Sequence, residues 1–158
     1  MGPTLIVCPL AVMNNWVEQV QQHCARGSLR YLEYHGQDRI GDPDYLKDFH
    51  IVITTYHIVE RESRMEETGL MGVKWLRICL DEAHTIRSRT TKKWRACCAI
   101  RAERRWALTG TPVQNKLDDL YSLFAFIQIK PWADYRFWKA NVLQMMKGGN
   151  IQDVQISF

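Results

Sequence analysis

Short apolar runs alternate with amphipathic segments along most of the chain. Five such runs predict strands, at residues 4–8, 29–34, 51–55, 75–80 and 106–109. Between and after them, hydrophobic residues recur at intervals of three and four, which predicts helices that pack through one stripe. The predicted helices are 12–24, 42–48, 91–102, 117–127 and 135–145. Residues 60–72 are charged and are predicted to form an exposed loop, whereas Trp16, Trp94 and Trp106 are predicted to lie in the core.

This alternation predicts an α/β fold in which a parallel sheet carries helices on both faces. In such sheets the functional side chains gather at the carboxyl ends of the strands. Four predicted strands end close to Pro9, Thr54, Asp81 and Thr109. We therefore expect a functional site at the edge of the sheet where these four positions meet.

The composition narrows the class of protein. The chain has 158 residues, of which 46% are hydrophobic and 24% charged, as in a soluble domain with a substantial core. No apolar run approaches the roughly 20 residues that span a bilayer, so no membrane association is expected. The N-terminus does not resemble a signal peptide. Five cysteines without a CxxC pair argue against a disulfide framework or a zinc site, and favour a reducing compartment.

Positive charge is concentrated in one segment of the chain. Residues 87–105 contain eight basic side chains and one acidic side chain, Glu103. Because the whole chain carries a formal charge of only +4, the remainder is net negative. Such a segment can attract phosphate backbones, although a solvated helix face would show the same composition. Charge alone leaves both interpretations open.

The tetrapeptide at 81–84 (DEAH) follows a predicted buried strand. Two adjacent carboxylates at such a place suit phosphoryl transfer to water, because one can hold Mg²⁺ while the other accepts a proton. Two acids that cap the start of a helix would look the same. A second motif favours the catalytic interpretation: residues 105–115 (RWALTGTPVQN) place a turn rich in hydroxyls and amides at the end of the next strand. Taken alone, this would be an ordinary Gly-Pro turn.

Four motifs in this order resemble the first ATPase lobe of superfamily-two helicase-like proteins, in the Swi/Snf branch. Residues 4–10 (TLIVCPL) are similar to motif Ia, 52–56 (VITTY) to motif Ib, 81–84 to motif II and 108–115 to motif III. The resemblance covers residues 4–138. It is closest to helicase-like transcription factor and its fungal DNA-repair relatives, through 34–39 (YHGQDR) and 130–134 (KPWAD) among others.

The resemblance implies a RecA-like P-loop NTPase lobe and a DNA-dependent ATPase that translocates on double-stranded DNA. It implies that Asp81 binds Mg²⁺ through water and that Glu82 is the general base, with ATP and Mg²⁺ as cofactors. Five residues would relay nucleotide state: His84, Thr109, Gly110, Thr111 and Gln114. Five others would lie near the DNA backbone: Pro9, Leu10, Thr54, Thr55 and Tyr56. Nucleosomes are implied as a further partner, and the nucleus as the location.

The family's phosphate-binding loop has no counterpart here, since no GxxxxGK[ST] motif occurs. We therefore expect a lobe without its first strand and phosphate loop (1–147), followed by a boundary segment (148–158) that is expected to be disordered. The family's second lobe would be a partner of this chain. The chain alone is expected to be inactive, with an unpaired edge on the strand at 106–109. The alternative is a degenerate lobe that binds DNA or protein without catalysis.

Overall fold

The computed structural model describes residues 2–65, 67–111 and 117–147. Five strands form one sheet in the order β2-β3-β1-β4-β5, and every neighbouring pair is parallel. The strands are β1 (Thr4–Cys8), β2 (Tyr31–Glu33), β3 (Ile51–Thr55), β4 (Trp75–Leu80) and β5 (Ala102–Ala107). This confirms the parallel α/β fold that the alternating pattern predicts.

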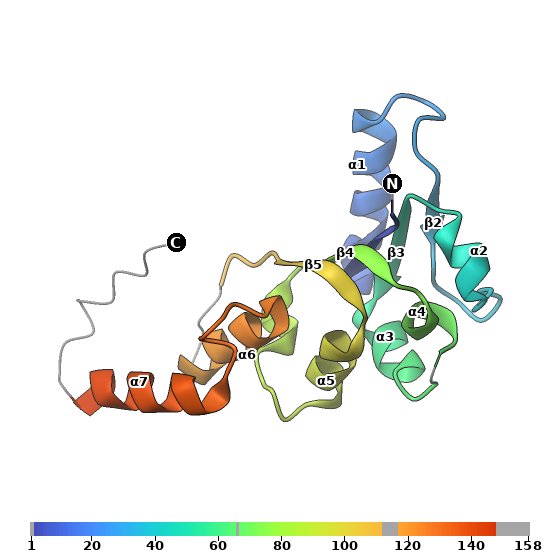
Figure 1. Ribbon diagram of the computed structural model, residues 1–158. Helices are drawn as coiled ribbons and strands as arrows, with labels where there is room; N and C mark the ends of the chain where they lie inside the picture. Colours follow the sequence, from blue (N-terminus) through green and yellow to red (C-terminus); the bar gives the residue numbers. More distant parts are fainter. Residues whose placement is uncertain (1, 66, 112–116, 148–158) are drawn as a thin grey trace.

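Helices lie on both faces of the sheet (Figure 1). The α-helices are α1 (Met13–His23), α2 (Pro43–Lys47), α3 (Tyr56–Glu62), α4 (Gly69–Gly72), α5 (Lys92–Ala99), α6 (Leu117–Ile127) and α7 (Tyr135–Lys147). Two short 3-10 helices, η1 (Leu10–Val12) and η2 (Ala83–Ile86), follow β1 and β4. Successive side chains of β1 therefore enter different cores: Leu5 and Val7 face α3, α5 and α6, whereas Ile6 and Cys8 face α1.

The segment from Glu60 to Gly72 is not the exposed loop that its charge predicts. It contains the end of α3 and all of α4. Glu62 is only 4% exposed, because its carboxylate accepts hydrogen bonds from Tyr34 Oη (2.8 Å), Arg39 Nε (3.0 Å) and the main-chain N–H of Leu70 (2.9 Å). A buried carboxylate needs such partners, and they come from distant parts of the sequence.

Three further predictions change at the last strand. The helix predicted over 91–102 ends at Ala99, and β5 begins at Ala102 rather than Trp106. Trp106 is 56% exposed and not in the core. It lies opposite Cys79 on the face that α1 covers, but β5 is the outer strand, whereas α1 packs over β3, on the far side of β1 and β4. Trp94 does pack against the main core, as predicted.

Candidate nucleotide and DNA site

Asp81 follows β4 directly and is held from several sides. Its main-chain N–H donates to Val7 of β1 (2.8 Å), which extends the sheet by one bond. Carboxylate Oδ1 accepts from the N–H of Glu82 (2.9 Å), and Oδ2 accepts from Nε1 of Trp16 (2.8 Å). The main-chain carbonyl accepts from the hydroxyl of Tyr56 (2.6 Å). The carboxylate is therefore oriented before any ligand binds.

Glu82 has a left-handed backbone, with φ 49° and ψ 49°. Such a conformation is uncommon for a residue with a side chain and is found at functional sites. The turn leaves the Glu82 side chain 47% exposed at the carboxyl edge of the sheet, next to Asp81. One carboxylate of the pair is thus anchored, while the other is accessible.

His84 and Thr109 join the end of β4 to the end of β5. Nδ1 of His84 lies 3.3 Å from Oε2 of Glu82 and 3.4 Å from Oγ1 of Thr109. The N–H of Ala83 donates to the carbonyl of Leu108 (2.8 Å), and Thr109 Oγ1 accepts from the N–H of Thr111 (3.2 Å). The two motifs that are 25 residues apart in sequence therefore meet, as expected from the carboxyl ends of adjacent parallel strands.

Two other residues, Gly110 and Gln114, are also predicted to relay nucleotide state. Gly110 has no described atom within 4 Å of where a Cβ would lie, so it sits in open space. Gln114 lies outside the described residues. Of the five residues predicted to relay nucleotide state, the structure thus describes four: His84, Thr109, Gly110 and Thr111.

The predicted DNA-contact residues separate into two groups. Leu10 is 60% exposed and Pro9 is half-buried, so both present side-chain surface beside the end of β1. The side chains of 54–56 are buried instead. Thr54 Oγ1 donates to the carbonyl of Tyr34 (2.9 Å), and Thr55 Oγ1 caps α3 by accepting from Ile58 N–H (3.4 Å). The hydroxyls of the last two residues of β3 thus support the fold at this edge.

Sequence reasoning missed the polar role of Trp16. Its spacing on α1 predicts a core residue, and the indole does pack against the smaller core of Ile6, Cys8, Met13 and Ile53. The same indole also donates to Asp81, 65 positions away. Periodicity indicates which way a side chain points, but it does not predict a hydrogen-bond acceptor that a distant part of the sequence brings to that place.

Asp81 and Glu82 fit Mg²⁺ better than a transition metal. Oxygen donors suit this ion, which keeps several waters and takes only one or two carboxylates from a protein. No group of three or more His, Cys, Asp or Glu residues that could hold a metal ion occurs in the part of the chain that the structure describes. Two carboxylates together with water or phosphate oxygens would satisfy this preference.

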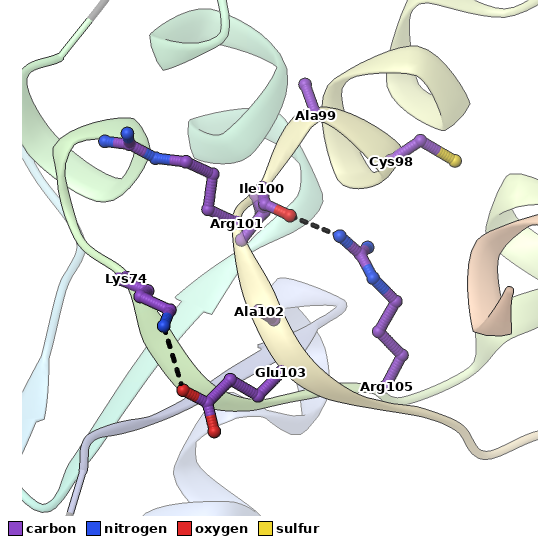
Figure 2. A pocket seen from close by; sticks show the side chains of 8 residues that line it. All are labelled: Lys74, Cys98, Ala99, Ile100, Arg101, Ala102, Glu103 and Arg105. Carbon is purple, nitrogen blue, oxygen red and sulfur yellow. Dashed lines mark hydrogen bonds and ion pairs between the residues drawn. The ribbon is translucent and has the colours of Figure 1, made fainter.

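A separate hollow lies at the opposite edge of the sheet (Figure 2). Its lining includes Lys74, Arg101 and Glu103, which precede or begin β4 and β5, whereas Asp81 follows β4. Its charged groups already have partners: Lys74 Nζ lies 3.1 Å from Glu103 Oε1, Arg101 donates to the carbonyl of Met71, and Arg105 donates to the carbonyl of Ile100. This hollow is therefore not assigned to the site.

Comparison with known proteins places the chain in a family. The SNF2-related domain matches residues 1–154. The chain is 43% identical to the helicase-like transcription factor of Mus musculus, over 85% of this chain and 14% of that protein. It is 38% identical to DNA repair protein RAD5A of Arabidopsis thaliana, over 98% of this chain and 16% of that protein. The chain thus spans about a sixth of the length of these relatives.

A solved structure shares the fold. The SWI2/SNF2 ATPase core of Sulfolobus solfataricus, in complex with dsDNA, matches with a TM-score of 0.75 and 35% identity. The match covers 94% of this chain and 30% of the other. The five-stranded sheet is accordingly a RecA-like lobe. The chain belongs to the SNF2-related domain family, with helicase-like transcription factor and RAD5 proteins among its relatives.

Proposed function

We propose that the chain is part of a lobe of a DNA-dependent ATPase that translocates on double-stranded DNA, in chromatin remodelling or DNA repair. The observation that carries the proposal is the meeting of Asp81, Glu82 and Thr109 at one edge of adjacent parallel strands. The relative named as a DNA repair protein supports it, as does the structural match named as a dsDNA complex.

In this proposal Asp81 holds Mg²⁺ through the ion's water shell. Bound MgATP supplies the phosphoryl group and the cation that neutralises charge on the phosphates. Glu82 accepts the proton of the attacking water, a role that its accessible carboxylate suits. His84, between Glu82 and Thr109, relays nucleotide state towards Gly110, Thr111 and Gln114.

The DNA backbone would pass along the ends of β1 and β3. Pro9 and Leu10 contribute accessible side chains there. Residues 54–56 contribute main-chain atoms, since their side chains are bonded internally. Contacts of this kind grip phosphates without reading bases. Nucleosomes and a second ATPase lobe complete the proposed partners, and the nucleus is the proposed location.

The chain alone is expected to bind ATP weakly and to hydrolyse essentially none. No GxxxxGK[ST] motif occurs in its 158 residues, so the amides and lysine that cradle a triphosphate are absent from it.

No helix in the described ranges has both the length and the apolar character needed to cross a bilayer.

The second candidate is a degenerate lobe that binds DNA or protein without catalysis. An anchored Asp81 beside an exposed Glu82 speaks against it, because binding alone requires neither carboxylate. Triplex displacement by the parent protein separates the two candidates. ATP-dependent displacement of a third strand from duplex DNA, abolished by Asp81→Asn, is the expected result. DNA binding with no ATP hydrolysis, unchanged by Asp81→Asn, would establish the degenerate lobe instead.

A further inference from the structure

We infer that Trp16 and Tyr56 are positioning residues that transmit DNA occupancy to Asp81. The inference rests on the proposed function and extends it to two residues that have no other assigned role in coupling. Both reach Asp81 by hydrogen bonds. Trp16 follows one segment that we propose to touch DNA, and Tyr56 is the last residue of the other. The two segments therefore share one acceptor residue at the Mg²⁺ site.

Trp16 lies in the first turns of α1, only six residues after Leu10. Its ring is partly buried against the core of Ile6, Cys8, Met13 and Ile53. Packing on that side leaves the ring little freedom to turn independently of α1. A movement of α1 or of the segment before it must therefore move Nε1, which donates to Asp81 Oδ2 at 2.8 Å.

Tyr56 is the first residue of α3 and directly follows Thr54 and Thr55. It is 4% exposed, and its hydroxyl donates to the main-chain carbonyl of Asp81 at 2.6 Å. This bond fixes the backbone at Asp81, while the Trp16 bond fixes the carboxylate. Together they set both the position and the rotation of the group that would hold Mg²⁺ through water.

The geometry of these bonds makes them sensitive to small displacements. A hydrogen bond to a carboxylate is strong near 2.8 Å and weakens steeply as the donor bends away. A shift of either DNA-contacting segment by a fraction of an ångström would change the orientation of the Asp81 carboxylate. Bound DNA would in this way alter the Mg²⁺ site without contacting it.

The other tryptophans show that this arrangement is specific to Trp16. Trp75 donates to the main-chain carbonyl of Leu70 (3.0 Å), and Trp94 donates to that of Ser122 (3.0 Å). Among the described tryptophans, only Trp16 donates to a side chain, and that side chain is Asp81. Trp94→Phe is consequently a matched control, because it removes an indole N–H bond of similar length away from the site.

The first test compares ATP hydrolysis by the parent protein with and without duplex DNA. We expect Trp16→Phe and Tyr56→Phe to lower the DNA-stimulated kcat about tenfold, and more than the unstimulated rate. Trp94→Phe should keep its stimulation. Full stimulation in both site variants, or an equal loss in Trp94→Phe, would overturn the inference. A wild-type ATPase that ignores DNA would instead contradict the proposed function itself.

The second test needs no catalysis. Indole N–H resonances of the 158-residue chain, labelled with ¹⁵N-tryptophan, are recorded during titration with duplex DNA in the absence of nucleotide. Trp16→Phe assigns its own signal, and Trp75→Phe, which removes the N–H bond to Leu70, assigns the control. We expect the Trp16 resonance to shift with DNA occupancy while the resonance of the buried Trp75 stays in place, and Tyr56→Phe to reduce the shift. A Trp16 resonance that stays in place while other signals report DNA binding would refute the coupling.

Discussion

Arg39 Nε lies 3.0 Å from Oε1 of Glu62, and the two side chains are only 12% and 5% exposed. Tyr34 donates to the same carboxylate oxygen, and the N–H of Leu70 donates to the other. Tyr34, Arg39 and Leu70 thus meet at one buried anion, the Glu62 carboxylate. Gly69, next to Leu70, leaves room for this carboxylate because it has no side chain: a Cβ at this position would lie 2.2 Å from Glu62 Oε2. Its φ of +52° also favours glycine.

Arg39→Met is expected to lower the free energy of unfolding by about 3–5 kcal/mol, because it leaves the Glu62 carboxylate buried without its cation. Urea unfolding followed by circular dichroism measures the change. Lys47→Met, which breaks the exposed pair between Lys47 and Asp44 at the same formal charge change, is the matched control and should alter stability little. An equal change in the free energy of unfolding for the two variants would show that the buried pair contributes no more to stability than the exposed pair.

Glu82→Gln in the parent protein is expected to bind ATP but to lose DNA-stimulated hydrolysis by about 10²–10⁴-fold, since the amide retains the shape and removes the base. Steady-state phosphate release together with nucleotide binding measures both effects. Glu103→Gln, at the opposite edge of the sheet, should hydrolyse ATP normally. Near-normal turnover in Glu82→Gln would remove this residue from the mechanism.

The basic segment should contribute to DNA binding only through part of its length. Lys92 and Arg95 line open grooves between α3 and α5, whereas Arg105 is turned inward over the ring of Phe126. Lys92→Glu with Arg95→Glu should weaken duplex binding and lower the slope of log K against log salt by about 2, one unit for each lost phosphate contact.

Fluorescence titration of the chain with duplex DNA at several salt concentrations measures this slope. Lys130→Glu with Lys139→Glu changes the net charge equally at exposed positions elsewhere and is the control. A solvated helix face, the alternative for this segment, would make both double variants lose the same affinity.

Alkaline pH should destabilise the fold through its thiols. Burial raises the pKa of Cys79 and Cys98 to about 11 and that of Cys8 to about 12, from an ordinary value of 9.0. The folded chain therefore holds thiol protons that the unfolded chain releases. Stability should be unaffected by these groups below pH 9 and should fall as pH rises from 9 towards 11 and 12.

Urea midpoints at pH 8 and pH 10.5 measure the alkaline loss. Burial raises the pKa of Tyr34 and Tyr56 as well, so their contribution has the same sign. Cys79→Ala with Cys98→Ala should therefore reduce the loss without abolishing it. An unchanged loss in that variant would show that these thiols do not contribute to it.

The outer edge of β5 is expected to limit solubility. Trp106 and Leu108 are 56% and 40% exposed, and no described strand pairs with that edge. Open apolar edges favour association, and an added lysine discourages it. Trp106→Lys should raise the concentration at which light scattering begins, with little change in thermal midpoint. Phe137→Lys, on helix α7 rather than at a strand edge, should raise it less.

Much of the site could be read from local sequence. Asp81 and Thr109 follow apolar runs, and parallel strands bring such ends to one edge, so their proximity follows from the alternation of strands and helices. The order of the four motifs likewise identified the family, which the match to the SNF2-related domain confirms. These features follow from hydrophobic patterns and motifs that span only a few neighbouring residues, so they can be predicted without knowledge of the fold.

Only the tertiary structure decided which partners the side chains meet. The pattern placed Trp16 and Trp106 in the core and Glu62 in an exposed loop. In the folded chain, Trp16 bonds to Asp81, Trp106 lies on an uncovered face, and Glu62 is buried. Each outcome depends on an element far away in sequence: a carboxylate 65 positions distant, a helix that does not reach the last strand, an arginine 23 positions back. Local pattern determines the direction of a side chain, but the packing of distant elements determines what lies there.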